Sequence, residues 1–201
     1  QVREWQAKKG VAIVMDVTNG EILALASTPS FNPNEYWNFS PSLFREWSVQ
    51  DLFEPGSTFK PINLALALEE GVIKPNGEVE DTGVINIGGW SLSNWDKKAN
   101  GKINYPRVLQ LSSNVGMVKI MRNLDSEKYW EWLHMLGIDS SPDTDLPGAA
   151  SGHLKSKEIF TTHPIEPAVA SFGQGFSITP LKLAQLHALI ANGGILIKPH
   201  I

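Results

Sequence analysis

The sequence predicts an α+β fold, in which helices pack on an antiparallel sheet. Three observations lead to this prediction: a hairpin signal opens the chain, helical segments fill much of its middle and later parts, and a short β-rich run ends it. Strands followed by a group of helices are typical of layered α+β domains. With 201 residues, of which 42% are hydrophobic, the chain can bury a sizeable core, and we expect one domain over residues 1–201.

The hairpin is expected near the start of the chain. Val11–Val17 and Glu21–Ala26 are mostly apolar and β-rich, and Asn19-Gly20 lies between them. Asn-Gly between two such runs is a strong hairpin signal, because both residues tolerate the positive φ angles of a tight turn. Ser27–Pro55 comes next, rich in Pro, Asn, Ser and aromatic residues. Its lack of periodicity predicts a long ordered surface segment over a groove.

The first helix is expected after Pro55-Gly56. Apolar residues in Ser57–Glu70 cover most of the helix circumference, which is typical of a buried central helix, and Gly71 is a suitable end. Capping and stop signals predict the later helices, the last of which begins at a Thr-Pro pair. The expected ranges are Pro106–Leu111, Val115–Asn123, Ser126–Leu136 and Pro180–Asn192.

The remaining segments are predicted from turn residues and β-like pieces. Val72–Asn104 alternates short β-like pieces with Gly, Asn and Asp, which indicates short strands joined by turns. Ser140–Pro167 is rich in Pro, Gly and Asp and is expected to be a loop. Ile195–Lys198 resembles a strand that is just beginning.

Composition excludes several classes of function. The net charge of −4 argues against a nucleic-acid partner, because such proteins usually carry a basic patch. The absence of cysteine excludes a thiol nucleophile, thiolate metal sites and disulfides. The longest apolar stretches, Val11–Met15 and Ile22–Ala26, are far shorter than the roughly 20 residues that span a bilayer. Gln1–Gly10 is polar and charged, so it does not resemble a signal peptide.

Ser57 and Lys60 are the first pair that can carry chemistry. Residues three apart on a helix lie on one face, so a lysine with a lowered pKa can take the proton of the serine hydroxyl. Burial in the predicted central helix would lower that pKa. The start of a helix also offers free N–H groups to an oxyanion. Alone the pair is weak, because a capping serine beside a lysine whose amine reaches solvent is the better explanation of an isolated Ser-x-x-Lys.

Ser112-Ser113-Asn114 is the second pattern. By itself it reads as a polar break between two helices. Together the two patterns are a more specific indication of an acyl-transfer site, because Ser-x-x-Lys followed by Ser-x-Asn is shared by penicillin-binding proteins and class A β-lactamases. In such a site Ser112 would relay a proton between Lys60 and the leaving amine, and Asn114 would hold Lys60 and the substrate.

The amino-acid sequence around both patterns resembles that of the class B penicillin-binding proteins. Glu54–Pro61, with the sequence EPGSTFKP, is similar to their active-site segment, and Ser112–Gly116 is similar to their second motif. Ala12–Asn34 resembles their opening strands, and Phe172–Leu181 resembles a late loop and helix. The similar blocks lie along almost the whole chain in family order. The resemblance therefore implies the transpeptidase fold shared with serine β-lactamases.

The resemblance implies a peptidoglycan D,D-transpeptidase, with the septal type favoured over the elongation type. Ser57 would attack the D-Ala–D-Ala amide of a pentapeptide stem with Lys60 as base, and an amine of an acceptor stem would then resolve the ester. β-Lactams would leave Ser57 acylated, and neither a metal nor an organic cofactor is implied. The parent protein would be anchored at the periplasmic face of the bacterial cytoplasmic membrane. Its partners would include a membrane glycosyltransferase and other division proteins.

The chain departs from the family pattern at its ends. The third motif, Lys-Thr-Gly or Lys-Ser-Gly, is absent, and in the family it lies on a strand beyond Ile195–Lys198. The membrane anchor and the non-catalytic pedestal domain are missing as well. We therefore expect a partial transpeptidase domain, truncated at its C-terminus. On its own this fragment is expected to have little or no activity, since one lost oxyanion donor costs about 10²–10³ in rate.

Two other functions stay open. A serine β-lactamase or β-lactam sensor shares the motifs, although the sequence shows no added general base for water. A non-catalytic scaffold that keeps the fold for partner binding is the other alternative. The remaining candidates are weaker. The histidines lack the spacing of metal ligands, and Asp143-Thr144-Asp145 and Gly173-Gln174-Gly175 are expected in loops. Trp130 and Trp132 are expected to pack on a helix, while Trp90 and Trp95 would flank a turn and shape the groove.

Overall fold

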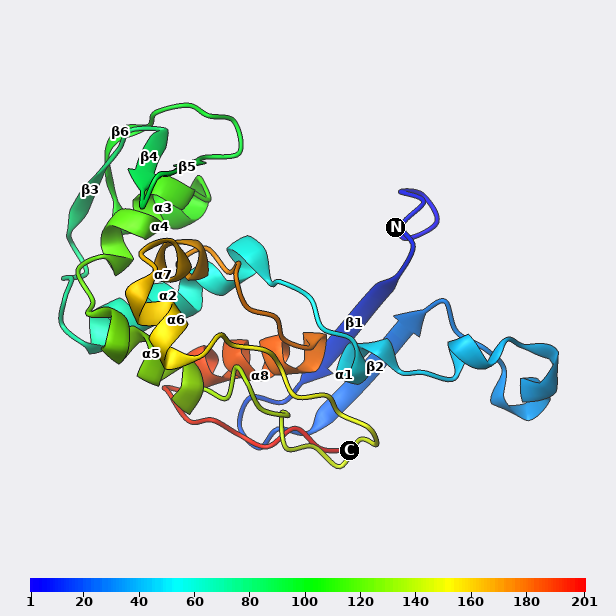
Figure 1. Ribbon diagram of the computed structural model, residues 1–201. Helices are drawn as coiled ribbons and strands as arrows, with labels where there is room; N and C mark the ends of the chain where they lie inside the picture. The colour runs from blue at the N-terminus through cyan, green and yellow to red at the C-terminus, as the bar shows by residue number, and fades with distance from the viewer. The chain divides into compact units, whose positions relative to one another are not determined.

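The structure, a computed structural model, describes residues 1–201 and contains both helices and antiparallel strands (Figure 1). The chain forms two compact units. The first comprises Gln1–Phe53, Asp139–Gly152 and Ile178–Ile201, and the second comprises Glu54–Ile138 and His153–Ser177. The expectation of one partial domain over residues 1–201 stays a prediction. Among the helices, none has both the length and the apolar character that a membrane crossing requires.

The predicted hairpin is confirmed in the first unit. β1 (Gly10–Met15) pairs antiparallel with β2 (Ile22–Thr28), with Ala12 opposite Ala26. The connection is wider than a tight Asn-Gly turn, because Asp16 and Asn19 each accept a backbone hydrogen bond from two residues ahead. A register shift at Val14/Met15 adjusts the strands to this turn.

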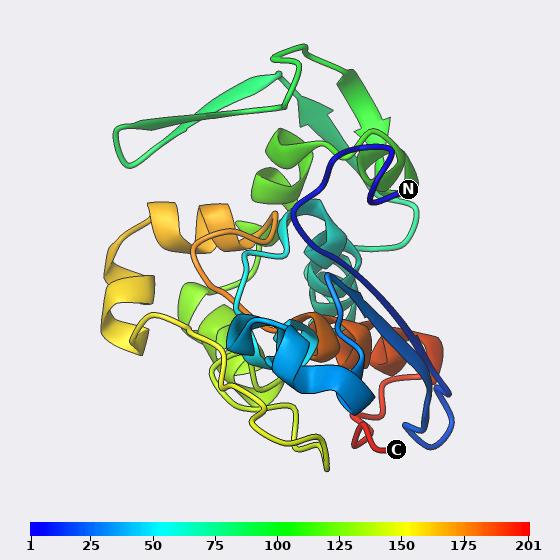
Figure 2. The ribbon, with the colours of Figure 1, turned by 90° about the vertical axis from the view of Figure 1, so that its right-hand side faces the viewer.

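Helix α8 (Pro180–Ala191) packs against this hairpin and against α1 (Trp47–Gln50) (Figures 1 and 2). Thr179 caps its start by accepting a hydrogen bond from the N–H of Lys182 at 3.1 Å, as the Thr-Pro signal predicts. Leu181 is fully buried beside Ile22 and Val49, so the apolar face of the hairpin closes a small core. Two short 3₁₀ helices, η1 (Pro33–Asn38) and η2 (Pro41–Leu43), lie in the predicted surface segment.

The strand predicted at Ile195–Lys198 is wrong. Side chains take the backbone groups that a neighbouring strand would have bonded: Asn192 bonds both the N–H and the C=O of Ile195, and Gln185 donates to the C=O of Ile197. Near this end, a parallel bridge joins His200 to Glu21. A short apolar run therefore does not form a strand where side chains already bond its backbone groups.

The second unit holds the other strands, as predicted for Val72–Asn104. β3 (Glu78–Asp81) pairs antiparallel with β6 (Gly101–Asn104), and β4 (Val84–Ile87) pairs with β5 (Trp90–Ser93). With the hairpin they make three two-stranded antiparallel sheets, where the sequence predicted a single sheet. The α+β class is confirmed.

The helices of the second unit match most of the predicted ranges. They are η3 (Gly56–Phe59), α2 (Lys60–Glu69), α3 (Tyr105–Gln110), α4 (Asn114–Met121) and α5 (Ser126–Met135). Asp125 caps α5, and Gly71 follows α2 with a φ of 66°. Helix α2 contacts α4 and is buried at Ile62, Leu66 and Ala67, although Leu68 is 38% exposed. The prediction of a mostly buried helix is confirmed.

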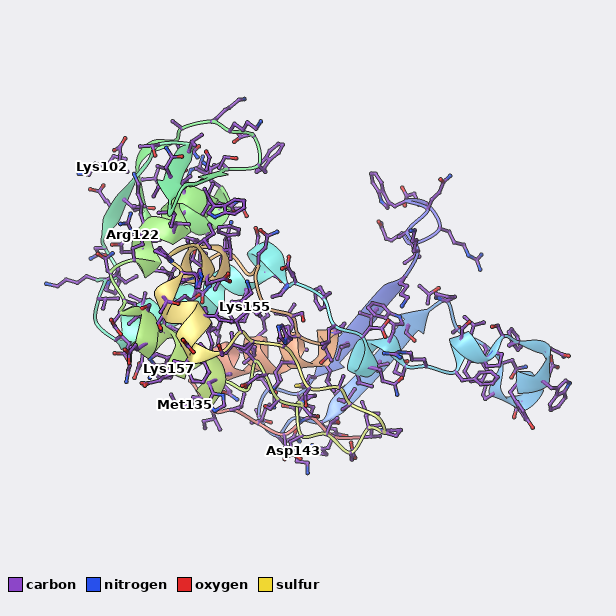
Figure 3. All side chains as sticks on the ribbon, in the orientation of Figure 1. Lys102, Arg122, Met135, Asp143, Lys155 and Lys157 are labelled. Atoms are coloured by element: carbon purple, nitrogen blue, oxygen red, sulfur yellow. The ribbon has the colours of Figure 1, made fainter.

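The loop predicted over Ser140–Pro167 is wrong in its second half. Helix α6 (Lys157–Thr162) and the start of α7 (Ile165–Ala170) lie there. Phe160 is buried against Tyr129 with ring centroids 5.5 Å apart, and Lys157 bonds Glu127 and Glu131 of α5 (Figure 3). Both helices are too short to show a period, and tertiary packing supplies most of their stability.

Asn63 joins three helices of the second unit. Its amide, fully buried on α2, donates to the C=O groups of Ala170 and Ser171, both at 2.9 Å. Its oxygen accepts a hydrogen bond from the Tyr129 hydroxyl at 2.9 Å. Since buried polar groups must be paired, this one side chain satisfies groups on α2, α5 and the end of α7.

We expect Asn63→Ala to lower the free energy of unfolding by about 2–4 kcal/mol, because the Ser171 carbonyl and the buried Tyr129 hydroxyl lose their hydrogen bonds to the Asn63 amide. Denaturant unfolding followed by circular dichroism measures this loss. Asn86→Ala is the control, since Asn86 is exposed on β4 and should change stability by about 0.5 kcal/mol or less. Equal losses of stability in the two variants would contradict the role of Asn63 in joining the three helices.

Candidate active site

Ser57 lies in η3, directly before α2, and its side chain is exposed. The N–H of Lys60 donates to the C=O of Ser57, so the 3₁₀ turn continues into the helix. Gly56 has a φ of 56°, a left-handed conformation that glycine adopts without strain. The turn therefore presents the Ser57 hydroxyl to solvent at the start of a helix, where the helix dipole favours negative charge.

Lys60 is the centre of a hydrogen-bonded cluster in which only 1% of its surface is exposed. Its Nζ donates to the Ser112 carbonyl oxygen at 2.6 Å, to Ser112 Oγ at 3.1 Å and to Asn114 Oδ1 at 2.7 Å. Burial lowers the pKa of Lys60 to about 8. A lysine with this pKa is neutral in roughly one molecule in ten at pH 7, and that neutral form can accept a proton.

Ser112 and Asn114 reach Lys60 from the turn between α3 and α4. Ser112 has a φ of 53°, and this left-handed residue reverses the chain after α3. Ser113 caps α4, with its Oγ accepting from the N–H of Gly116 at 2.8 Å. Hydrogen bonds thus bring Lys60, Ser112 and Asn114 together, and Ser57 lies three residues before Lys60 in the turn that leads into α2.

The loop at Gly173–Gly175 packs directly against the segment that carries Ser57. The N–H of Gly56 donates to the Gly173 carbonyl at 2.8 Å, and the N–H of Gly175 donates to Glu54 Oε1 at 2.9 Å. Phe59 and Phe176 pack edge to face beside it, with ring centroids 4.8 Å apart. The glycine pair is therefore a backbone support for η3, in agreement with the loop expected from the sequence.

We expect Gly173→Ala to slow acylation of Ser57 by about 10²-fold, because a Cβ would overlap the Gly56 backbone and displace η3. Gly89→Ala is a matched control. Both glycines have positive φ values, 81° and 87°, but a Cβ at Gly89 meets open space. The rate of labelling by a fluorescent penicillin measures the difference. A Gly173→Ala rate equal to that of Gly89→Ala would contradict the close-approach argument.

Sequence reasoning missed the polar residues behind the site. Asp81, Asn94 and Ser113 are buried and linked to one another: Asp81 accepts from Asn94 Nδ2 at 2.9 and 3.0 Å and from Ser113 Oγ at 2.7 Å. Asp81-Thr82-Gly83 and Ser93-Asn94 look like ordinary turn sequences, and their meeting depends on the pairing of β4 with β5, the two strands between them.

The other candidates take the places expected for packing or loop residues. Trp130 Nε1 donates to the Lys155 carbonyl and Trp132 Nε1 to Glu70, so both indoles pack at the helix surface as predicted. Asp143-Thr144-Asp145 lies in a loop. Trp90 and Trp95 are exposed, and their role in a groove stays a prediction. No group of three or more His, Asp or Glu side chains is placed to hold a metal ion.

Comparison with known proteins identifies the family. The family model described as "Penicillin binding protein transpeptidase domain" matches residues 10–201. The chain belongs to this family. The match covers both compact units and all four predicted site residues.

Relatives of this transpeptidase-family chain agree. It is 44% identical over 209 residues to a "Peptidoglycan D,D-transpeptidase FtsI homolog" of Mesostigma viride, covering 100% of the chain and 35% of that relative. Over 190 residues it is 35% identical to "Peptidoglycan D,D-transpeptidase FtsI" of Escherichia coli (strain K12), covering 94% of the chain and 32% of the relative. The chain thus spans about a third of the length of the curated relatives it matches.

Solved structures give the same fold. The chain matches the apo transpeptidase domain of penicillin-binding protein 3 from Burkholderia pseudomallei with a TM-score of 0.86 and 32% identity, covering 100% of the chain and 55% of the solved one. It matches a peptidoglycan glycosyltransferase from Burkholderia ambifaria with a TM-score of 0.86 and 32% identity, covering 100% of the chain and 58% of the solved one. The transpeptidase-family fold expected from the sequence is confirmed.

Proposed function

We propose that the protein carrying this chain is a peptidoglycan D,D-transpeptidase of the septal type, in which Ser57 forms the acyl-enzyme. The observation that carries the proposal is the buried Lys60 amine, which hydrogen-bonds both Ser112 and Asn114 one helical turn from Ser57. Relatives with 44% and 35% identity carry the name peptidoglycan D,D-transpeptidase, which supports the substrate class.

In this proposal each residue of the site has its own role in the reaction. Neutral Lys60 takes the proton as Ser57 Oγ attacks the carbonyl carbon of the D-Ala–D-Ala amide. Ser112 Oγ, at 3.1 Å from the amine, passes the proton to the departing D-Ala nitrogen. The Asn114 amide orients Lys60, and the start of the helix supports the oxyanion. An acceptor amine then attacks the ester carbonyl, the bond to Ser57 Oγ breaks, and a proton from the acceptor amine passes through Ser112 and Lys60 to Ser57 Oγ, which restores the hydroxyl.

The parent protein would act outside the cytoplasmic membrane. The resemblance to class B penicillin-binding proteins supports an N-terminal anchor and exposure to the periplasm, where the pentapeptide and acceptor stems are found. It also supports a membrane glycosyltransferase and other division proteins as partners. β-Lactams would bind as mimics of D-Ala–D-Ala.

The proposal is tested with the full-length protein and purified pentapeptide substrate. We expect release of D-Ala together with crosslinked stems, and a stoichiometric dose of penicillin should block both. The lifetime of the penicillin adduct separates the alternatives: an adduct that persists for many turnovers of substrate supports a transpeptidase, whereas rapid hydrolysis would indicate a β-lactamase. If neither D-Ala release nor a penicillin adduct is detected, the non-catalytic scaffold is the remaining alternative.

A further inference from the structure

Asp81 is a buried carboxylate at the end of β3 that accepts hydrogen bonds from several directions. It is fully buried and accepts from the N–H of Gly83 at 2.8 Å, from Asn100 Nδ2 at 2.6 Å and from Ser113 Oγ at 2.7 Å, in addition to Asn94 Nδ2. Burial raises the pKa of this carboxyl, but the hydrogen bonds outweigh burial and hold the pKa below its ordinary value. Asp81 is therefore ionised, and it can only accept hydrogen bonds.

The carboxylate fixes which way the Asn94 amide points. Asn94 Nδ2 donates to both oxygens of Asp81 and to the Lys98 carbonyl at 3.0 Å. Its Oδ1 must then face the other way, where it accepts from the N–H groups of Asn114 at 2.9 Å and Val115 at 3.2 Å. These are the first amides of α4, which have no partner inside the helix.

The same contacts set the position of the groups around Lys60. With its backbone held by Asn94, Asn114 donates from Nδ2 to the Ser93 carbonyl at 3.0 Å and turns Oδ1 toward Lys60 Nζ at 2.7 Å. Ser112, two residues before, is held in its left-handed conformation between the ends of α3 and α4. A shift of this turn would move all three acceptor atoms of the Lys60 amine.

We propose that Asp81 and Asn94 are positioning residues, which hold the Ser112–Asn114 turn so that Ser112 and Asn114 aim the Lys60 amine for acyl transfer. Both side chains are at most 3% exposed, so they act through Asn114 and Ser113 and do not reach the substrate. This inference rests on the proposed function, because it assigns a supporting role within that site.

The test compares acylation by a fluorescent penicillin in the full-length protein. We expect Asn94→Ala to lower the acylation rate constant by about 10²-fold, since displacements near 1 Å reduce rates by that factor. The dissociation constant of the noncovalent penicillin complex should stay within about twofold. Asn100→Ala is the matched control, because Asn100 also bonds Asp81, yet none of its hydrogen bonds reaches the turn at residues 112–116. It should lose much less rate than Asn94→Ala, because Asp81 keeps its hydrogen bonds to Gly83, Asn94 and Ser113.

An equal loss of rate in Asn94→Ala and Asn100→Ala would overturn the proposal, because the network would then act only on stability. A wild-type rate in Asn94→Ala would overturn it as well. Should that variant fail to fold, Asp81→Asn keeps the side-chain shape while placing a donor against Asn94, and the same loss of rate is expected.

Backbone amide exchange gives a readout that does not depend on activity. We expect the N–H groups of Asn114 and Val115 to exchange faster in Asn94→Ala, while those in the middle of α4 keep their protection. A wild-type protein that does not acylate would defeat the proposed function alone. Unchanged exchange at Asn114 and Val115 would defeat the positioning role, whatever the wild-type protein does.

Discussion

Ser57→Ala is expected to abolish acylation by penicillin, with a loss on the order of 10⁶-fold, the size seen when a serine enzyme loses its nucleophile. The side chain is exposed, so the variant should fold as the wild type does and keep its melting temperature. Intact-protein mass spectrometry after incubation with penicillin measures the adduct directly. The expected spectrum contains the unmodified mass alone.

Thr58→Val is the control for this prediction. Thr58 is adjacent to Ser57 and donates its hydroxyl to the Pro55 carbonyl at 2.6 Å, so its loss disturbs η3 without removing the nucleophile. We expect Thr58→Val to form the adduct to completion, at a reduced rate. An adduct on Ser57→Ala at a rate near that of the wild type would show that another residue is the nucleophile.

Lys60→Met is expected to slow acylation by about 10²–10⁴-fold, the usual contribution of a general base. Methionine has a similar length and no charge, so the buried position stays filled while the proton acceptor is lost. The rate of penicillin labelling at saturation measures the change. A variant that labels within about threefold of the wild type would exclude Lys60 as the base.

The pH dependence of acylation arises from the same residue. Because the pKa of Lys60 is about 8, acylation by the wild type should rise with pH through about 8, where half of the amine is neutral, and level off roughly one pH unit higher. Lys60→Met should remove this rise. A flat wild-type profile between about pH 6.5 and 9 would contradict the assignment of Lys60 as the base.

Stability is a poorer reporter of Lys60 than acylation is. A lysine whose pKa falls from 10.5 to about 8 on folding binds fewer protons in the folded state between those values. Stability therefore rises with pH in that window, and the burial penalty is fully present below about 8. Burial lowers the pKa of Lys182 to about 8 as well, so an unfolding curve reports both lysines together.

Much of the site could be predicted because its chemistry lies in short local patterns. Ser57 and Lys60 are three residues apart, and Ser112 and Asn114 are two apart, so helix and turn geometry fix each pair locally. Their meeting was inferred from family resemblance, and the hydrogen bonds from Lys60 to both members of the second pair now show it. The cap at Thr179 was predicted for the same local reason.

The parts that sequence reasoning missed depend on distant contacts. The α6 and α7 helices are six residues each, and packing of Phe160 against Tyr129 stabilises them where local propensity does not. The backbone at Ile195 and Ile197 is bonded by the side chains of Asn192 and Gln185, which no apolar pattern reveals.

The polar support behind the turn was missed for a related reason. Asp81, at the end of β3, meets Asn94, just after β5, only because the chain between them forms strands β4 and β5. Each residue alone looks like part of a surface turn, yet both are buried in the structure. A residue's role in such a network depends on which strands pair, and the spacing of turn residues does not specify that pairing.

Peptide mapping of the penicillin adduct tests the central claim most directly. Full-length protein is acylated to completion, digested, and analysed by tandem mass spectrometry to locate the added mass. We expect a single modified peptide, with the acyl group on Ser57. An acyl group on any other residue, Ser112 included, would contradict the assignment of Ser57 as the nucleophile and of Lys60 as its base.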